Sequence, residues 1–195
     1  MSEDTIKLSA ELFSEAKEIG KARHDSNRKA GVMLDVRSDH YDGYKVDAEG
    51  VAGEMAFAQL IDAPESEWDK IRHIRPTSAV KGEDFGDCDY RGYRFDVKTT
   101  PYQGGHVLVT TSKLLSTNID GYVLMCGEEG EYRFAGCISH GRVVKGIMDG
   151  RYRMKSRDTY WVAQSDLRPL PPRDCSEDFR AWNKKQVDAY RARLK

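Results

Sequence analysis

Hydrophobic residues repeat with two different periods along the chain, and the change of period falls near residue 86. Before it, apolar side chains recur every three to four residues, which predicts helices over residues 9–23 and 49–62. After it, apolar and polar residues alternate, which predicts strands over 87–90, 93–98, 105–111, 121–126, 131–138 and 159–163. Residues 24–48 are polar and predict a loop or a short hairpin.

Turn and capping residues separate these elements. Residues 91–92, Arg-Gly, predict a two-residue turn between the first two strands, and residues 127–130 predict a second hairpin. Prolines between 169 and 172 mark a connector, and Ser176 is placed to cap a C-terminal helix. Three large aromatic residues are expected in the core: Trp68, Trp161 and Trp182.

These elements predict a single α/β domain in which helices flank a mixed central β-sheet. We divide it into an N-terminal helix and polar loop (1–48), a core (49–168), and a Pro-rich connector with an extra C-terminal helix (169–195). The length of 195 residues suits one domain, and 39% hydrophobic residues suffice for a core.

Composition excludes several classes of protein. No run approaches the roughly 18 apolar residues that a membrane helix needs, and the acidic beginning of the chain does not resemble a secretory signal. The four cysteines form no C-x-x-C pair. We therefore expect a reduced, cytoplasmic protein that has no membrane partner.

The net charge of −1 hides an uneven distribution. Residues 1–64 hold 8 basic and 13 acidic residues, whereas residues 101–195 hold 16 basic and 11 acidic ones. An anionic partner would therefore meet the second half of the chain. Alternating cations there could follow a phosphate backbone or simply form a solvated edge: Arg151, Arg153, Lys155 and Arg157. A weaker candidate group lies near the N-terminus: Arg23, Arg28, Lys29 and Arg37.

The first hairpin places carboxylates where a purely structural explanation is difficult. If residues 91–92 form the turn, Asp89 faces Arg94 in an ion pair, and Asp87 faces Asp96. Like charges so opposed are destabilising, and a divalent cation between Asp87 and Asp96 would remove the difficulty. Lys98 follows on the same face as Asp96. A hairpin whose charged residues are merely solvated is the structural alternative.

A helical carboxylate joins this set. Glu54 lies on the inward stripe of the helix over 49–62, and a buried carboxylate without a partner is costly. A nearby metal ion or lysine would satisfy it. Small residues in the same helix would let it approach a sheet closely: Gly50, Ala52, Gly53 and Ala56.

Glu54, Asp87 and the Asp96-Val97-Lys98 triplet together resemble the PD-(D/E)XK nuclease superfamily, which has the restriction-endonuclease-like fold. The segment GVAGEMAFAQL resembles the Gly-x-x-Gly-Glu helix of many members. The resemblance covers roughly residues 49–111 and extends to short phage-type nucleases of the superfamily. Gly86 stands where the name of the family implies proline.

The resemblance implies an Mg²⁺-dependent nuclease, most simply an endonuclease acting on DNA, with RNA still open as a substrate. It implies that Asp87, Asp96 and the Val97 carbonyl bind Mg²⁺, for which Mn²⁺ could substitute. Glu54 would complete the coordination directly or through water, and Lys98 would orient or help to deprotonate the attacking water. Gln103 is a weaker candidate for phosphate contact. A homodimer would suit cleavage of both strands.

A rival hypothesis from another class remains at this point. The chain could be a non-catalytic nucleic-acid-binding or accessory protein that retains the nuclease fold. The intact set of carboxylates and lysine argues against it, and a response of thermal stability to Mg²⁺ or Mn²⁺ would discriminate between the two.

Overall fold

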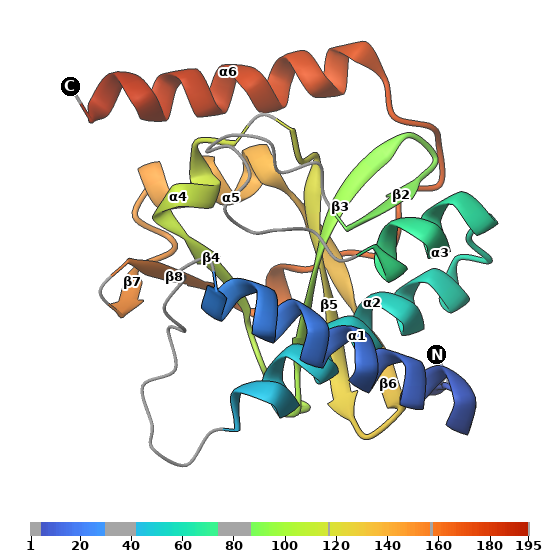
Figure 1. Ribbon diagram of the computed structural model, residues 1–195. Helices are drawn as coiled ribbons and strands as arrows, with labels where there is room; N and C mark the ends of the chain where they lie inside the picture. Colours follow the sequence, from blue (N-terminus) through green and yellow to red (C-terminus); the bar gives the residue numbers. More distant parts are fainter. Residues whose placement is uncertain (1–4, 30–41, 74–86, 117, 157, 195) are drawn as a thin grey trace.

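The computed structural model describes residues 5–29, 42–73, 87–116, 118–156 and 158–194 (Figure 1). The helices are α1 (Ala10–Lys29), α2 (Gly43–Leu60), α3 (Glu65–Arg72), α4 (Thr111–Leu114), α5 (His140–Met148) and α6 (Glu177–Arg193). The strands are β1 (Thr5–Lys7), β2 (Cys88–Tyr90), β3 (Tyr93–Thr100), β4 (Val107–Thr110), β5 (Gly121–Glu128), β6 (Glu131–Ser139), β7 (Met154–Ser156) and β8 (Thr159–Val162).

The strands form two sheets. The larger has the order β1-β6-β5-β3-β2, with β3 and β5 parallel and the other pairs antiparallel. The smaller has the order β4-β8-β7 and is antiparallel. The chain is therefore a mixed α/β protein with a mixed central sheet flanked by helices, as the sequence predicts at this level.

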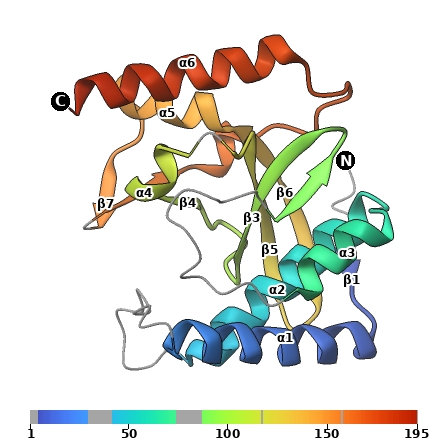
Figure 2. The same ribbon diagram turned by 45° about the horizontal axis from the view of Figure 1, so that its top comes forward.

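Alternation along the strands divides the apolar residues between the two faces of the large sheet. Phe95, Val97 and Val123 join a core with α1 and α2, whereas Tyr122 and Leu124 join a second core with α5, α6 and the small sheet. Figure 2 shows α1 and α2 on one side of the sheet and α6 on the other. In the described part of the chain, no helix is both long and apolar enough to cross a membrane.

The first two helices are longer than predicted. The prediction of a loop over 24–48 is wrong for residues 24–29, which continue α1, and for 43–48, which begin α2; residues 30–41 lie outside the described part. The reason is close packing between the helices. A Cβ atom on Gly20 would lie 2.5 Å from the backbone of Ala48, and His24 Nδ1 lies 2.9 Å from Asp47 Oδ2. The polar residues that led to the loop prediction therefore lie in the contact between the two helices.

The predicted strands and the C-terminal helix are confirmed, with small changes at their ends. Helix α5 was not predicted; its N-terminus is capped by Ser139, whose hydroxyl accepts the N–H of Arg142. The expectation of three core tryptophans holds only for Trp68, which packs against the first core. Trp161 is 40% exposed and Trp182 is 36% exposed, so that prediction is wrong for both.

Candidate active site

The β2–β3 hairpin has the predicted register over Cys88–Tyr90, but the predicted pairing of Asp87 with Asp96 is not part of the ladder. Tyr90 pairs with Tyr93 and Asp89 with Arg94, so Arg91 and Gly92 form a two-residue turn. Both turn residues have positive φ, 50° and 77°, which is the backbone conformation of a type I′ turn. The register therefore follows from the turn, as expected.

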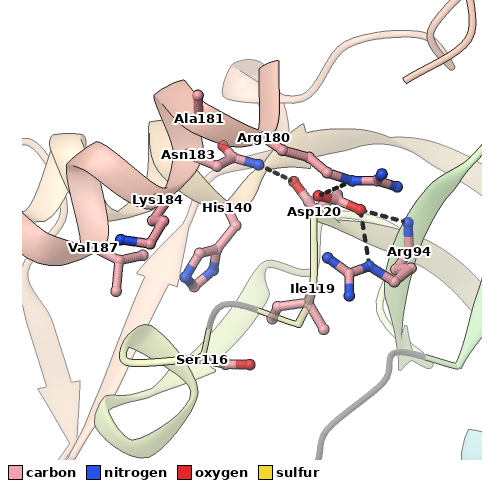
Figure 3. Close-up of a pocket in the computed structure, with 10 residues that line it drawn as sticks. All are labelled: Arg94, Ser116, Ile119, Asp120, His140, Arg180, Ala181, Asn183, Lys184 and Val187. Carbon is pink, nitrogen blue, oxygen red and sulfur yellow. Dashed lines mark hydrogen bonds and ion pairs between the residues drawn. The ribbon is translucent and has the colours of Figure 1, made fainter. Parts of the chain in front are cut away.

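The predicted ion pair between Asp89 and Arg94 is absent, although both residues are described. Asp89 Oδ2 instead lies 3.1 Å from Lys70 Nζ of α3. Arg94 Nε lies 3.2 Å from Asp120 Oδ2 (Figure 3). Each of the two charged groups pairs with a residue outside the hairpin, and the hairpin sequence alone could not indicate these partners.

Asp87 lies one residue before β2 and follows the edge of β3. Its N–H donates to the Phe95 carbonyl at 2.7 Å, and its Oδ2 accepts the Val97 N–H at 2.8 Å. Among the described strands, none pairs with this edge of β3 beyond Phe95. Because the N–H and C=O of one strand residue point the same way, the Val97 carbonyl faces the same edge as Asp87.

Asp96 is buried beside this edge and is bracketed by two lysines. Its exposure is 3%, and its Oδ1 accepts a hydrogen bond from Lys98 Nζ at 2.9 Å. Its Oδ2 is buried and has no hydrogen-bond partner; Lys113 Nζ of α4 lies 3.7 Å away, beyond hydrogen-bond range. Lys113 was not among the predicted site residues.

Glu54 reaches the same cluster from α2. The helix lies so close to β3 that a Cβ atom on Gly53 would collide with the Thr99 side chain. Glu54 is buried, and Arg23 Nη1 of α1 donates to both of its carboxylate oxygens, at 2.9 and 3.0 Å. The other guanidinium nitrogen, Nη2, donates to the Ile71 carbonyl at 2.6 Å. Arg23 thus neutralises Glu54 instead of joining a basic strip.

The electrostatics of the cluster centre on Asp87. Burial, the charge of Glu54 and the charge of Asp96 raise the pKa of Asp87 well above its usual range, against the lowering effect of Lys98. Burial alone would lower the pKa of Lys98, but the charges of Asp96, Asp87 and Glu54 leave it raised. Lys98 therefore remains a cation at neutral pH, which suits charge stabilisation better than proton abstraction.

The residues available to a metal ion are fewer than the sequence suggests. Within the described ranges, no group of three or more His, Cys, Asp or Glu side chains could hold a metal ion. Asp87, Asp96 and the Val97 carbonyl remain, and Mg²⁺ is commonly bound by one or two carboxylates, with water and substrate phosphate completing its coordination. The buried Oδ2 of Asp96, which accepts no hydrogen bond, is the observation that fits such an ion.

The remaining candidates that the structure describes make their contacts outside this cluster. Gln103 accepts hydrogen bonds from Arg133, and Arg151 is paired with Asp166. Arg153 is exposed, whereas the side chains of Lys155 and Arg157 lie outside the described part. Of the weaker N-terminal group, Arg28 and Lys29 are exposed and Arg37 is not described.

Comparison of this chain with protein-family models, curated proteins and solved structures finds no significant match.

Proposed function

We propose that the chain is a metal-dependent nuclease of the PD-(D/E)XK type that hydrolyses phosphodiester bonds in DNA. The observation that carries the proposal is the carboxylate pair at the edge of β3. Asp87 and Asp96 lie side by side there, one with a raised pKa and the other with a buried oxygen that accepts no hydrogen bond, next to a charged lysine. A buried arrangement of this kind is unfavourable for stability and typical of catalytic sites.

Asp87, Asp96 and the Val97 carbonyl would hold Mg²⁺. The ion, when bound, would polarise the phosphate and acidify water. Lys98, fixed by Asp96 at 2.9 Å, would stabilise the negative charge that develops on the phosphate. Glu54 would act through water, because Arg23 occupies both of its oxygens.

The arrangement of elements also supports the proposal. A helix bearing Glu54 precedes a hairpin bearing Asp87, Asp96 and Lys98, and β3 pairs in parallel with β5, which follows β4 and α4 in the chain. This order is compatible with a restriction-endonuclease-like core. DNA is the substrate proposed, with RNA as the comparison in the assay.

The test is cleavage of linear, circular, single-stranded and branched DNA, and of RNA, in Mg²⁺, in Mn²⁺ and in EDTA. Lys98→Gln should lower the rate by roughly 10²–10³-fold, the effect of removing one group that stabilises transition-state charge. Lys70→Gln is the matched control, because Lys70 pairs with Asp89 of the same hairpin but lies outside the cluster.

Two results would contradict the proposal. Full activity of Lys98→Gln would remove Lys98 from the site. Absence of cleavage by the wild type with every substrate and metal, combined with retained nucleic-acid binding, would favour the non-catalytic binding protein.

A further inference from the structure

The small sheet carries an apolar surface on the face that points away from the core. Val107, Val109 and Val162 lie on its inner face and are completely buried. Because successive residues of a strand point to opposite faces, Leu108 of β4 and Trp161 of β8 point outward. Leu108 is 46% exposed, and Trp161 is nearly as exposed. A tryptophan and a leucine are therefore presented to solvent by a sheet whose other face is closely packed.

These two side chains form one patch with His106. Leu108 and Trp161 are directly opposed in the ladder between β4 and β8, so their Cβ atoms are about 5 Å apart. The ring of His106, just before β4, lies against the indole, with 5.2 Å between the ring centroids and 47° between the planes. The indole is therefore held in place by its neighbours and remains partly exposed. A flat, wide and fixed aromatic group of this kind suits stacking with another flat group.

The chain next to this patch is positively charged. β7 pairs with β8, and residues 151–158, which include β7, contain four basic residues and one acidic residue. Arg151 is paired with Asp166, whereas Arg153 is exposed and makes no ion pair within the described part of the chain. The net charge of this edge stays positive even when Asp166 is counted. An apolar patch alone would suit a second copy of the chain, but a positive border favours a ligand that is both flat and anionic. The nucleotides of a single strand have both properties.

The patch is connected to the carboxylate cluster through β4. This strand leads directly into α4, whose Lys113 Nζ lies 3.7 Å from Asp96 Oδ2 (Figure 1). The path from Leu108 to Lys113 is about 13 Å long, at about 3.3 Å per strand residue and about 1.5 Å per helical residue. That length equals about four nucleotides at the roughly 3.4 Å rise of one stacked strand. One short nucleic-acid strand is therefore long enough to reach both the cluster and Trp161.

We propose that Trp161, supported by Leu108 and His106, is a stacking platform for an unpaired base of the substrate. The proposal rests on the proposed nuclease function and makes it more specific, because the bases of an intact duplex already stack on one another. It favours a substrate that has single-stranded character, such as a single strand, a frayed end or a branch. Stacking accepts every base, so the platform would not select a sequence.

The variants separate the aromatic ring from its apolar bulk. Trp161→Leu keeps an apolar side chain but removes the ring, and Trp161→Phe keeps a smaller ring. Tyr44→Leu is the matched control, because Tyr44 is an aromatic residue of nearly equal exposure, 44%. It lies on α2, which packs on the other face of the large sheet from the small sheet. Melting temperatures of the variants check that each one folds.

Binding is measured in EDTA by fluorescence anisotropy, so that the result does not depend on cleavage. The probes are a short oligothymidylate, an abasic oligonucleotide of the same length, and a duplex. The wild type should bind oligothymidylate about tenfold more tightly than the abasic strand, the effect expected of one stacked base. Trp161→Leu should lose this preference, whereas Trp161→Phe should retain part of it and Tyr44→Leu all of it. The salt dependence of binding should not change in Trp161→Leu, because no phosphate contact is removed.

Each contrary outcome overturns a definite statement. Equal affinity of the wild type for oligothymidylate and the abasic strand would remove the platform, however the variants fold. An equal loss of affinity for both strands in Trp161→Leu would also overturn it, because Trp161 would then act through something other than a base. A wild type that is dimeric by light scattering, with a monomeric Trp161→Leu of unchanged base preference, would make the patch an interface between copies.

The two proposals fail separately. If the wild type cleaves nucleic acid but shows no preference for bases, the platform is wrong and the nuclease stands. If the wild type cleaves nothing, but Trp161→Leu loses a preference that the wild type shows, the nuclease proposal fails and the stacking platform stands.

Discussion

Two buried aspartates, one in β3 and one just before the neighbouring strand β5, differ in how many hydrogen bonds their carboxylates accept. Asp120, just before β5, accepts the Arg94 N–H at 3.0 Å and the Arg94 Nε–H at 3.2 Å, and it faces a second guanidinium from Arg180. Asp96, in β3, accepts one hydrogen bond from Lys98, and its other oxygen has no hydrogen-bond partner, although Lys113 Nζ lies 3.7 Å away. Their exposures are almost equal, at 2% and 3%.

On the proposed function, this difference separates a carboxylate that supports the fold from one that would be available for chemistry. Asp120 joins three elements, since Asn183 of α6 also donates to its backbone carbonyl at 3.1 Å. A buried carboxylate oxygen without a hydrogen bond costs on the order of 1–3 kcal/mol. This free-energy cost is not relieved at Asp96, as expected where a ligand would supply the missing contact.

The largest expected effect tests this contrast directly. Asp120→Asn should lower the free energy of unfolding by about 3 kcal/mol, because Arg94 and Arg180 would then face a neutral amide. Asp96→Asn should change it by less than about 1 kcal/mol, since the lost Lys98 contact is offset by relief of the repulsion with Asp87. Denaturant unfolding in EDTA measures both.

The activities should rank the other way. If the proposed function is right, Asp96→Asn should lose metal-dependent cleavage and the stabilisation that Mg²⁺ is expected to give to the wild type, whereas folded Asp120→Asn should keep both. If Asp96→Asn unfolds as easily as Asp120→Asn, then Asp96 is a structural residue and the contrast is wrong.

The sequence predicts those parts of the site that depend on local geometry. The type I′ turn at Arg91-Gly92 and the period of two place Asp87 beside Asp96, and the helical period turns Glu54 inward. No ladder pair joins the two aspartates, however. Asp87 lies beyond the end of β2 and bonds to the backbone of Phe95 and Val97.

The partners that set the charge balance were not predictable in the same way. Arg23 and Lys113 come from α1 and α4, and only the packing of these helices against the sheet brings them to Glu54 and Asp96. The same limit explains the ends of α1 and α2. His24 and Asp47 look solvated in the sequence but form an interhelical contact at 2.9 Å.

The second prediction concerns pH, and its expected effect is intermediate. The pKa of Asp87 is raised in the folded protein, so between the unfolded and folded pKa values the native state binds more protons. The free energy of unfolding of the metal-free protein should therefore fall as pH rises through that interval, by about 1.4 kcal/mol for each unit of the shift. Asp87→Asn keeps an acceptor for the Val97 N–H and should be the more stable protein at neutral pH.

Melting curves in EDTA from acidic to neutral pH provide the measurement. Asp87→Asn should lack the fall in stability with rising pH that is expected of the wild type, and Mg²⁺ should not raise its melting temperature. Glu49→Gln is a control at a carboxylate that bonds Tyr132, away from the site. Identical pH dependence of the wild type and Asp87→Asn would contradict the placement of the raised pKa.

The smallest expected effect concerns the surface, where one arginine of the basic segment has an ion-pair partner and another does not. Arg151 is paired with Asp166, whereas Arg153 is exposed and makes no ion pair within the described part of the chain. If the basic segment follows a phosphate backbone, Arg153→Gln should reduce the slope of log affinity against log salt by about 0.9 on duplex DNA, the contribution of one phosphate contact. Arg151→Gln should change the slope less, because Asp166 already balances the charge of Arg151.

The measurement is a salt titration of duplex binding in EDTA with both variants. An unchanged slope for Arg153→Gln would identify the segment as a solvated edge, and an equal loss for both variants would show that pairing with Asp166 does not withhold Arg151 from DNA.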